Sequence, residues 1–154
     1  MAMTMEGTFT VPADKQTVWV KLNDPDVLKT CIPGCQTLEK TSDTQFVATT
    51  KMKIGPVSAS FKGRVELLDV DAPNSCRIVG EGEGGIAGFA KGAANVRLSE
   101  VPEGTAVSYS VEANVGGKIA QLGGRLIDGV AKKMADQFFT NFAAAVSPKE
   151  AVAE

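Results

Sequence analysis

The chain has 154 residues, which is enough for a single domain with one core. Its composition is 44% hydrophobic and 22% charged with a formal charge of −2, which is typical of a soluble globular protein and excludes a disordered chain. There is no apolar run of about 18 residues, so no membrane-spanning helix is predicted. The slightly acidic charge argues against nucleic-acid binding.

The chain contains no histidine. Catalytic triads that use a histidine base, and metal sites that use imidazole ligands, are therefore excluded. No pair of carboxylates is predicted to point inward. We expect a protein without catalytic residues and without a metal site, and not an enzyme.

Three cysteines, Cys31, Cys35 and Cys76, make an odd count, and no secretory signal precedes them. This pattern favours a reducing, cytoplasmic location. Cys31 and Cys35 flank Ile-Pro-Gly, and we interpret them as two small thiols around a turn. A zinc site would need further ligands and usually has a tighter CxxC spacing.

The first predicted elements are a strand over 4–11 and two short helices. Apolar and polar residues alternate along the strand until Pro12 ends it. The first helix covers 14–22. Asp24 and Pro25 then form a cap and first turn for a second helix that stops before Pro33. Six more strands, separated by turn sequences, are predicted over 35–40, 45–54, 57–71, 76–84, 88–101 and 105–115.

From Gly117 the apolar period changes from 2 to 3.6, which predicts one long amphipathic helix that ends near Val146, before Pro148. We expect a single domain over 1–147 and a disordered tail over 148–154. A seven-stranded sheet needs a cover, and this helix offers the large apolar surface that can supply it. The predicted fold is therefore α+β, with a curved antiparallel sheet wrapped around the C-terminal helix.

Small residues are unusually common on the strand positions that should face this helix. They are Ala48, Ala59, Gly63, Gly80, Gly82, Gly92, Ala94 and Ala113. Two interpretations stay open: the glycines let the sheet bend around bulky helix side chains, or the small residues leave an elongated apolar cavity.

Such a cavity would hold few polar groups beyond Thr50 and the Tyr109 hydroxyl. It would suit a hydrophobic tail or a quinone ring better than a sugar or a phosphate. The residues expected to line it are Trp19, Ala48, Thr50, Met52, Ala59, Phe61, Gly63, Val65, Ile78, Gly80, Phe89, Ala94, Val96, Tyr109, Val111, Leu122, Leu126, Ile127, Val130 and Met134.

Glycine-rich segments elsewhere are interpreted as joints. Residues 82–87 fit a GxGxxA pattern, but a strand follows instead of a helix, so a mobile hairpin tip is favoured over a dinucleotide site. Ile86 and Phe89 on that tip could gate a pocket or touch a membrane or partner.

Gly123, Gly124 and Gly129 each cost the long helix about 1 kcal/mol relative to alanine. Close packing on the sheet, space for a ligand, or a deformable helix would explain them.

Several segments resemble the CoxG family, whose name denotes a subunit of carbon monoxide dehydrogenase. They are WVKLNDP at 19–25, CIPGC at 31–35, IGPV at 54–57, FKG at 61–63, the glycine-rich 82–85, GT at 104–105 and VGGKIAQLG at 115–123. The resemblance covers nearly the whole chain in order. It implies a helix-grip fold of the START-like (SRPBCC) superfamily.

The resemblance also implies a function without assigning catalytic residues. The family consists of accessory proteins of molybdenum hydroxylases of the carbon monoxide dehydrogenase type. They are associated with recruiting the enzyme to the membrane and with binding a respiratory quinone. The implied partners are therefore the hydroxylase complex, a hydrophobic small molecule (a quinone or a lipid) and peripherally the inner face of the cytoplasmic membrane.

Longer members carry a C-terminal membrane segment. Because this chain ends at Glu154, we expect any membrane contact at the tip formed by residues 86–89. Two alternatives stay open. One is an assembly factor that acts only through its surface, and the other is an enzyme of the START-like aromatase or cyclase kind.

Overall fold

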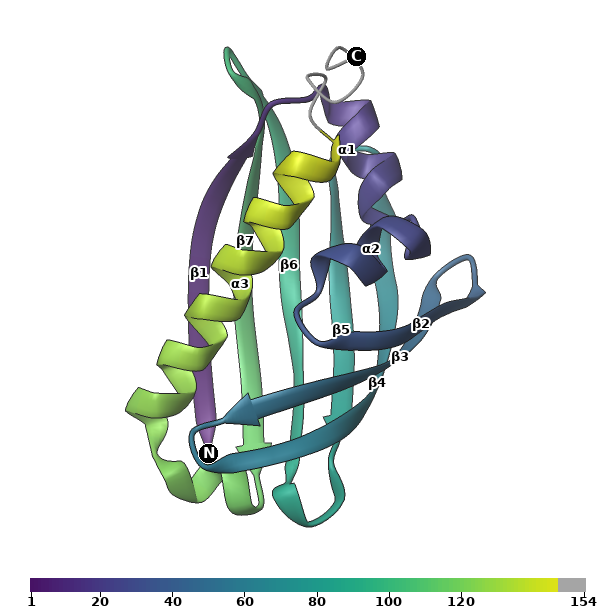
Figure 1. Ribbon diagram of the computed structural model, residues 1–154. Coiled ribbons are helices and arrows are strands. Elements are labelled where there is room, and N and C mark those ends of the chain that lie inside the picture. Colours follow the sequence, from purple (N-terminus) through teal and green to yellow (C-terminus); the bar gives the residue numbers. More distant parts are fainter. Residues whose placement is uncertain (147–154) are drawn as a thin grey trace.

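Seven antiparallel strands form one sheet in the order β1-β7-β6-β5-β4-β3-β2. The computed structural model describes residues 1–146, and the tail predicted over 148–154 lies outside that range (Figure 1). The strands are β1 (Ala2–Val11), β2 (Cys35–Ser42), β3 (Gln45–Ile54), β4 (Val57–Asp71), β5 (Ser75–Glu83), β6 (Phe89–Val101) and β7 (Gly104–Gly116). The predicted antiparallel meander is confirmed, and β1 extends it beside β7.

Two short helices follow β1, and an aspartate caps each of them. The carboxylate of Asp14 accepts a hydrogen bond from the backbone N–H of Thr17 at the start of α1 (Lys15–Leu22), and also one from the Thr17 hydroxyl. The Thr17 hydroxyl is the main reason why the pKa of Asp14 is lowered. Asp24 accepts from the N–H of Asp26 at the start of α2 (Pro25–Cys31). Both predicted helices are confirmed, because the caps satisfy donors that the helix leaves free.

The predicted long helix is divided in two. Residues Lys118–Leu122 form a 3-10 helix, η2, and α3 (Gly124–Val146) begins only after Gly123. Gly123 has φ +94, outside the right-handed helical region and accessible mainly to glycine. The apolar period continues across this break, which is why the sequence alone predicted an uninterrupted helix.

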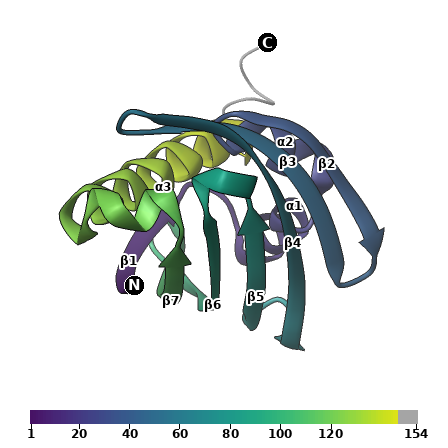
Figure 2. The ribbon, with the colours of Figure 1, turned by 90° about the horizontal axis from the view of Figure 1, so that it is seen from below.

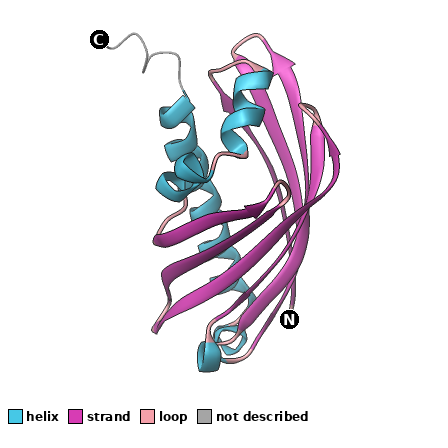
Figure 3. Cartoon of the chain, turned by 90° about the vertical axis from the view of Figure 1, so that its right-hand side faces the viewer, coloured by secondary structure: helices cyan, strands magenta, loops and turns pink. Residues whose placement is uncertain are grey.

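The sheet curls so that α3 lies on its concave side. Seen from below, β1, β7, β6 and β5 form one side of the curve, and β4, β3 and β2 bend round towards the helix (Figure 2). The view from the side shows β2 and β3 lying across the direction of the other strands (Figure 3). The helix α3 packs mainly against α2 and β1. Asn141 on α3 donates a side-chain hydrogen bond of 3.1 Å to the carbonyl oxygen of Cys31 at the end of α2.

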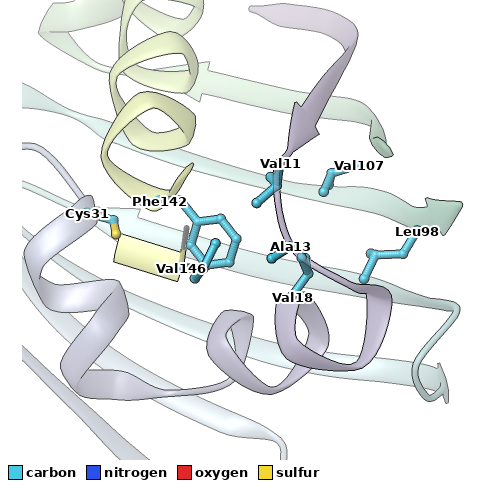
Figure 4. Packing of buried hydrophobic residues seen from close by; sticks show 8 residues of the cluster. All are labelled: Val11, Ala13, Val18, Cys31, Leu98, Val107, Phe142 and Val146. Carbon is cyan, nitrogen blue, oxygen red and sulfur yellow. The ribbon is translucent and has the colours of Figure 1, made fainter. Parts of the chain in front are cut away.

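Buried side chains form two separate clusters on the concave side. The upper cluster gathers the end of β1, both short helices and the C-terminal part of α3 (Figure 4). The lower cluster gathers η2, the start of α3 and the short 3-10 helix η1 (Gly85–Ala87) of the β5–β6 hairpin. The upper cluster is Val11, Ala13, Val18, Cys31, Leu98, Val107, Phe142 and Val146, and the lower cluster is Ile54, Phe61, Ala87, Val115, Ile119 and Ile127.

Gly129 lies on the exposed side of α3, and no atom lies within 4 Å of the position that an added Cβ would take. The same is true of Gly123 and Gly124, so close packing on the sheet does not explain these three glycines. We expect Gly129→Ala to raise the free energy of unfolding by about 0.5–1 kcal/mol, measured by urea denaturation, because glycine weakens a helix interior. An unchanged or lower value would mean that α3 needs a flexible point there.

Candidate functional site

The strand register places the small residues noted in the sequence side by side. Residues that face each other in an antiparallel pair lie on the same side of the sheet. One row crosses β3 to β6 and the next crosses β5 to β7, both on the inner face, the side of the sheet that faces α3. We call this contiguous group the small-residue patch. It consists of Ala48, Gly63, Gly82 and Ala90 in the first row and Gly80, Gly92 and Ala113 in the second.

The middle of the inner face is not filled. Among the described residues, the two buried clusters lie at its ends. Val65, Ile78 and Val111 lie between them, beside the patch, and are only half-buried although they are apolar and belong to central strands. A core that α3 filled completely would bury these side chains. The middle of the inner face, where the patch lies, therefore carries apolar side chains that α3 does not bury completely.

Most residues predicted to line a cavity do lie on the inner face. The strand residues of this kind are brought together by register alone, and most of them are half-buried. They are Ala48, Thr50, Met52, Ala59, Phe61, Gly63, Val65, Ile78, Gly80, Ala94, Val96, Tyr109 and Val111.

The predicted lining residues that belong to η2 and α3 lie at different places along these two helices. Ile127 is buried in the lower cluster, against which Leu122 and Val130 pack. Met134 is half-buried along the middle of α3. Leu126 is 37% exposed and reaches Gly55 in the β3–β4 turn. The helix therefore presents an apolar side to the inner face without burying it completely.

Two predicted residues lie elsewhere. Phe89 pairs with Gly116 and Glu83 at the start of β6, is 47% exposed and covers Gly116, so it points away from α3. The pairing of β6 is regular from Phe89 onwards, so Phe89 alternates with the inward Ala90 and takes an outward position. Trp19 on α1 packs against the upper cluster and not against the small-residue patch.

Sequence reasoning missed contributions from β1. Register with β7 puts Met3, Met5 and Gly7 on the inner face, beside Ala113, Val111 and Tyr109 respectively. The alternation of residues 4–11 contained this signal, because it assigned Met5 and Gly7 to an apolar side. The position of β1 next to β7 was the missing information, since β1 is the first strand in the chain and β7 the last.

Few polar groups reach the inner face. Thr50 and Tyr109 lie there as expected, together with the Cys76 thiol, which pairs in register with Val96. Burial raises the pKa of Cys76, so the thiol stays protonated near neutral pH and is not activated as a nucleophile. The buried Thr105 hydroxyl is used structurally, because it donates a 2.8 Å hydrogen bond to the carbonyl oxygen of Ala13.

The other cysteines also have structural surroundings. Cys31 is fully buried in the upper cluster, and burial raises its pKa. The Cys35 thiol donates a hydrogen bond of 3.3 Å to the carbonyl oxygen of Thr37. All three cysteines are free thiols. Within residues 1–146, no cluster of three or more potential metal ligands occurs.

Two large depressions cross the other side of the sheet, with volumes of about 1050 and 1020 Å3. Most of their lining residues point away from α3, among them Lys62, Arg64, Glu81 and Lys91. Arg64 and Glu81 form an exposed ion pair of 2.6 Å there. This charged outer face is open to water and is a poor site for a hydrophobic ligand.

The end of the β5–β6 hairpin is the most exposed apolar part of the described chain. Ile86 in η1 is 89% exposed, whereas its neighbour Ala87 is buried in the lower cluster. The turn is thus anchored on one side and presents a bare side chain on the other. No helix within the described residues is long and apolar enough to cross a bilayer.

Solved structures of similar shape exist. A conserved protein from Geobacillus kaustophilus is 30% identical, with a TM-score of 0.87 over 94% of this chain and 95% of that one. The Zhui aromatase/cyclase from Streptomyces sp. R1128 is 12% identical, with a TM-score of 0.69 over 95% and 94% of the two chains. The second likeness concerns the fold alone, and together they confirm the predicted helix-grip, START-like architecture.

The sequence comparisons agree with the resemblance noted above. None of the curated proteins that were compared matches the chain. The CoxG family, described as a subunit of carbon monoxide dehydrogenase, matches residues 7–147, which is nearly the whole length. This chain therefore belongs to the CoxG family.

Proposed function

We propose that the protein is a non-catalytic accessory subunit of a molybdenum hydroxylase of the carbon monoxide dehydrogenase type. In this proposal it holds a hydrophobic ligand, a quinone or a lipid, between the small-residue patch and α3, and it links the enzyme to the membrane. Membership of the CoxG family supports an accessory role beside carbon monoxide dehydrogenase. The ligand, the hydroxylase and the membrane link are proposals.

The observation that carries the ligand proposal is the half-buried middle of the inner face. Val65, Ile78 and Val111 keep contact with solvent on the concave side of the sheet, and each of them pairs with a glycine or an alanine on one neighbouring strand. Apolar surface of this kind gains about 25 cal/mol for each Å2 that a ligand covers. A hydrophobic molecule would complete the core that the two clusters leave open.

The membrane link rests on the hairpin tip. Ile86 and Phe89 are both exposed at one end of the molecule, close to η2. Exposed apolar side chains on an anchored turn can insert into the interface of a bilayer without a spanning helix. The same tip could instead contact the hydroxylase.

Native mass spectrometry of protein purified without detergent, together with an organic extract of the same sample, tests the ligand proposal. We expect a bound species with the mass of a quinone or a lipid, or such a species after incubation with decylubiquinone. A mass that corresponds to the chain alone, and that decylubiquinone does not change, would contradict the proposal. That result would favour an assembly factor that acts through its surface.

A further inference from the structure

A narrow cleft follows the free edge of β1. Its volume is about 320 Å3, and it lies between β1 and one side of α3, with Met5, Gly7, Tyr109, Lys132 and Phe139 among its lining residues. The strand β1 is the last in the sheet order, so no strand covers this edge. Met5, Gly7 and Tyr109 belong to the inner face. The cleft therefore includes residues of the inner face at the edge of the sheet.

Stacked aromatic rings fix Tyr109, the single tyrosine of the chain, at this cleft. The ring of Phe139 stacks against both Phe9 and Tyr109, with centroids 5.2 and 5.5 Å apart and planes within 18° and 20°. Phe138 meets Phe139 edge-on at 5.1 Å. These contacts hold the tyrosine ring in one orientation.

The missing side chain of Gly7 leaves room for the Tyr109 hydroxyl. A Cβ at residue 7 would lie 2.7 Å from the hydroxyl oxygen, so any other side chain there would displace it. Within the described chain no hydrogen bond to this hydroxyl is formed, and no buried polar side-chain atom lacks a partner. The unpartnered hydroxyl is therefore open to solvent or to a ligand. It is free to donate a hydrogen bond to an acceptor in the cleft.

The charges around the cleft restrict what that acceptor can be. Glu6, Asp128 and Asp136 line it together with a single cation, Lys132. The Lys132 ammonium already lies 3.4 Å from the Asp136 carboxylate. The excess of negative charge repels carboxylate and phosphate head groups and favours an uncharged acceptor, such as a carbonyl oxygen.

We propose that this cleft binds the polar end of the ligand, and that the Tyr109 hydroxyl donates a hydrogen bond to an uncharged carbonyl of a quinone-like ring. The apolar tail of the ligand then lies along the inner face. This inference rests on the proposed function, namely that the inner face binds a hydrophobic molecule. It selects a neutral quinone over a fatty acid or a phospholipid.

Isothermal titration calorimetry of the wild-type protein and Tyr109→Phe tests the assignment with two probes. Decylubiquinone carries carbonyl oxygens, and decylbenzene has the same tail without them. The variant keeps the ring stack and loses the hydroxyl alone. We expect it to bind decylubiquinone about three- to tenfold more weakly and decylbenzene equally well, as for the loss of one neutral hydrogen bond. Ser99→Ala is the matched control, because it also removes one hydroxyl, from an exposed residue on the outer face of β6 that does not line the cleft.

A charged probe, decanoate, tests the role of the carboxylates around the cleft. We expect the wild-type protein to bind decylubiquinone more tightly than decanoate, and Glu6→Gln combined with Asp128→Asn to reduce that difference. Equal decylubiquinone binding by the wild type and Tyr109→Phe, or an equal loss for both decyl probes, would overturn the head-group assignment while the proposed function stands. A wild-type protein that binds neither decyl probe would overturn the proposed function and the assignment with it.

Discussion

Filling the small-residue patch is expected to abolish retention of a hydrophobic ligand while the protein still folds. Gly63→Phe in the patch and Ala94→Trp in the row beside it each add a large side chain to the inner face, at positions between the two buried clusters. A ligand that loses roughly 100 Å2 of apolar contact loses about 2.5 kcal/mol, so decylubiquinone binding should weaken about 50-fold or more. Titration calorimetry and native mass spectrometry measure this loss.

The fold should tolerate these changes because the space exists. A Cβ at Gly63 would have the Glu81 carbonyl oxygen as its nearest neighbour, at 3.5 Å, which is an ordinary contact. Lys62→Phe and Ala93→Trp are the matched controls, since both residues precede their counterparts and point to the outer face. Undiminished ligand retention with both inner-face substitutions present would contradict the proposal that this face is the binding site.

The second large effect is expected at Phe142, which joins α3 to the rest of the protein. Its side chain is 0% exposed and stacks on Phe138 at 5.9 Å in the upper cluster. We expect Phe142→Ala to lower the free energy of unfolding by about 3–5 kcal/mol, because it removes buried apolar surface and leaves a void that rigid neighbours cannot fill. Urea denaturation followed by circular dichroism measures the difference.

Leu126→Ala provides the comparison for this prediction. Leu126 also lies on α3 but is 37% exposed, so its loss should cost about 1 kcal/mol or less. Similar losses for the two variants would mean that the upper cluster does not hold α3 in place. The position of α3 would then depend on η2 and the lower cluster.

The two effects are connected, because the upper and lower clusters leave the middle of α3 without buried side chains of its own. The buried residues of α3 are Ile127 near one end, and Phe142 and Val146 near the other. The helix is therefore supported at both ends, with a stretch between them that faces the middle of the inner face.

The sequence determined which side of each strand faces inward. Alternation has a period of two residues, so once one position of a strand is assigned to the core, all the others follow. The inward assignment from Phe46 to Val115 agrees with the observed register throughout. Turn residues between strands fixed the antiparallel order, because short links leave neighbouring strands no other arrangement. The cap at Asp24 located the second short helix in the same local way.

Tertiary structure alone decided where the apolar period of the C-terminal helix is interrupted and which distant residues come into contact. The apolar period runs through Gly123, whereas in the structure Gly123 has a positive φ that separates α3 from η2, which packs in the lower cluster. The cleft joins Gly7 on the first strand with Tyr109 on the last strand and Lys132 on the helix, both of which lie more than a hundred residues further along the chain. Such a meeting depends on how the whole sheet curls, and no periodicity within a single segment encodes that.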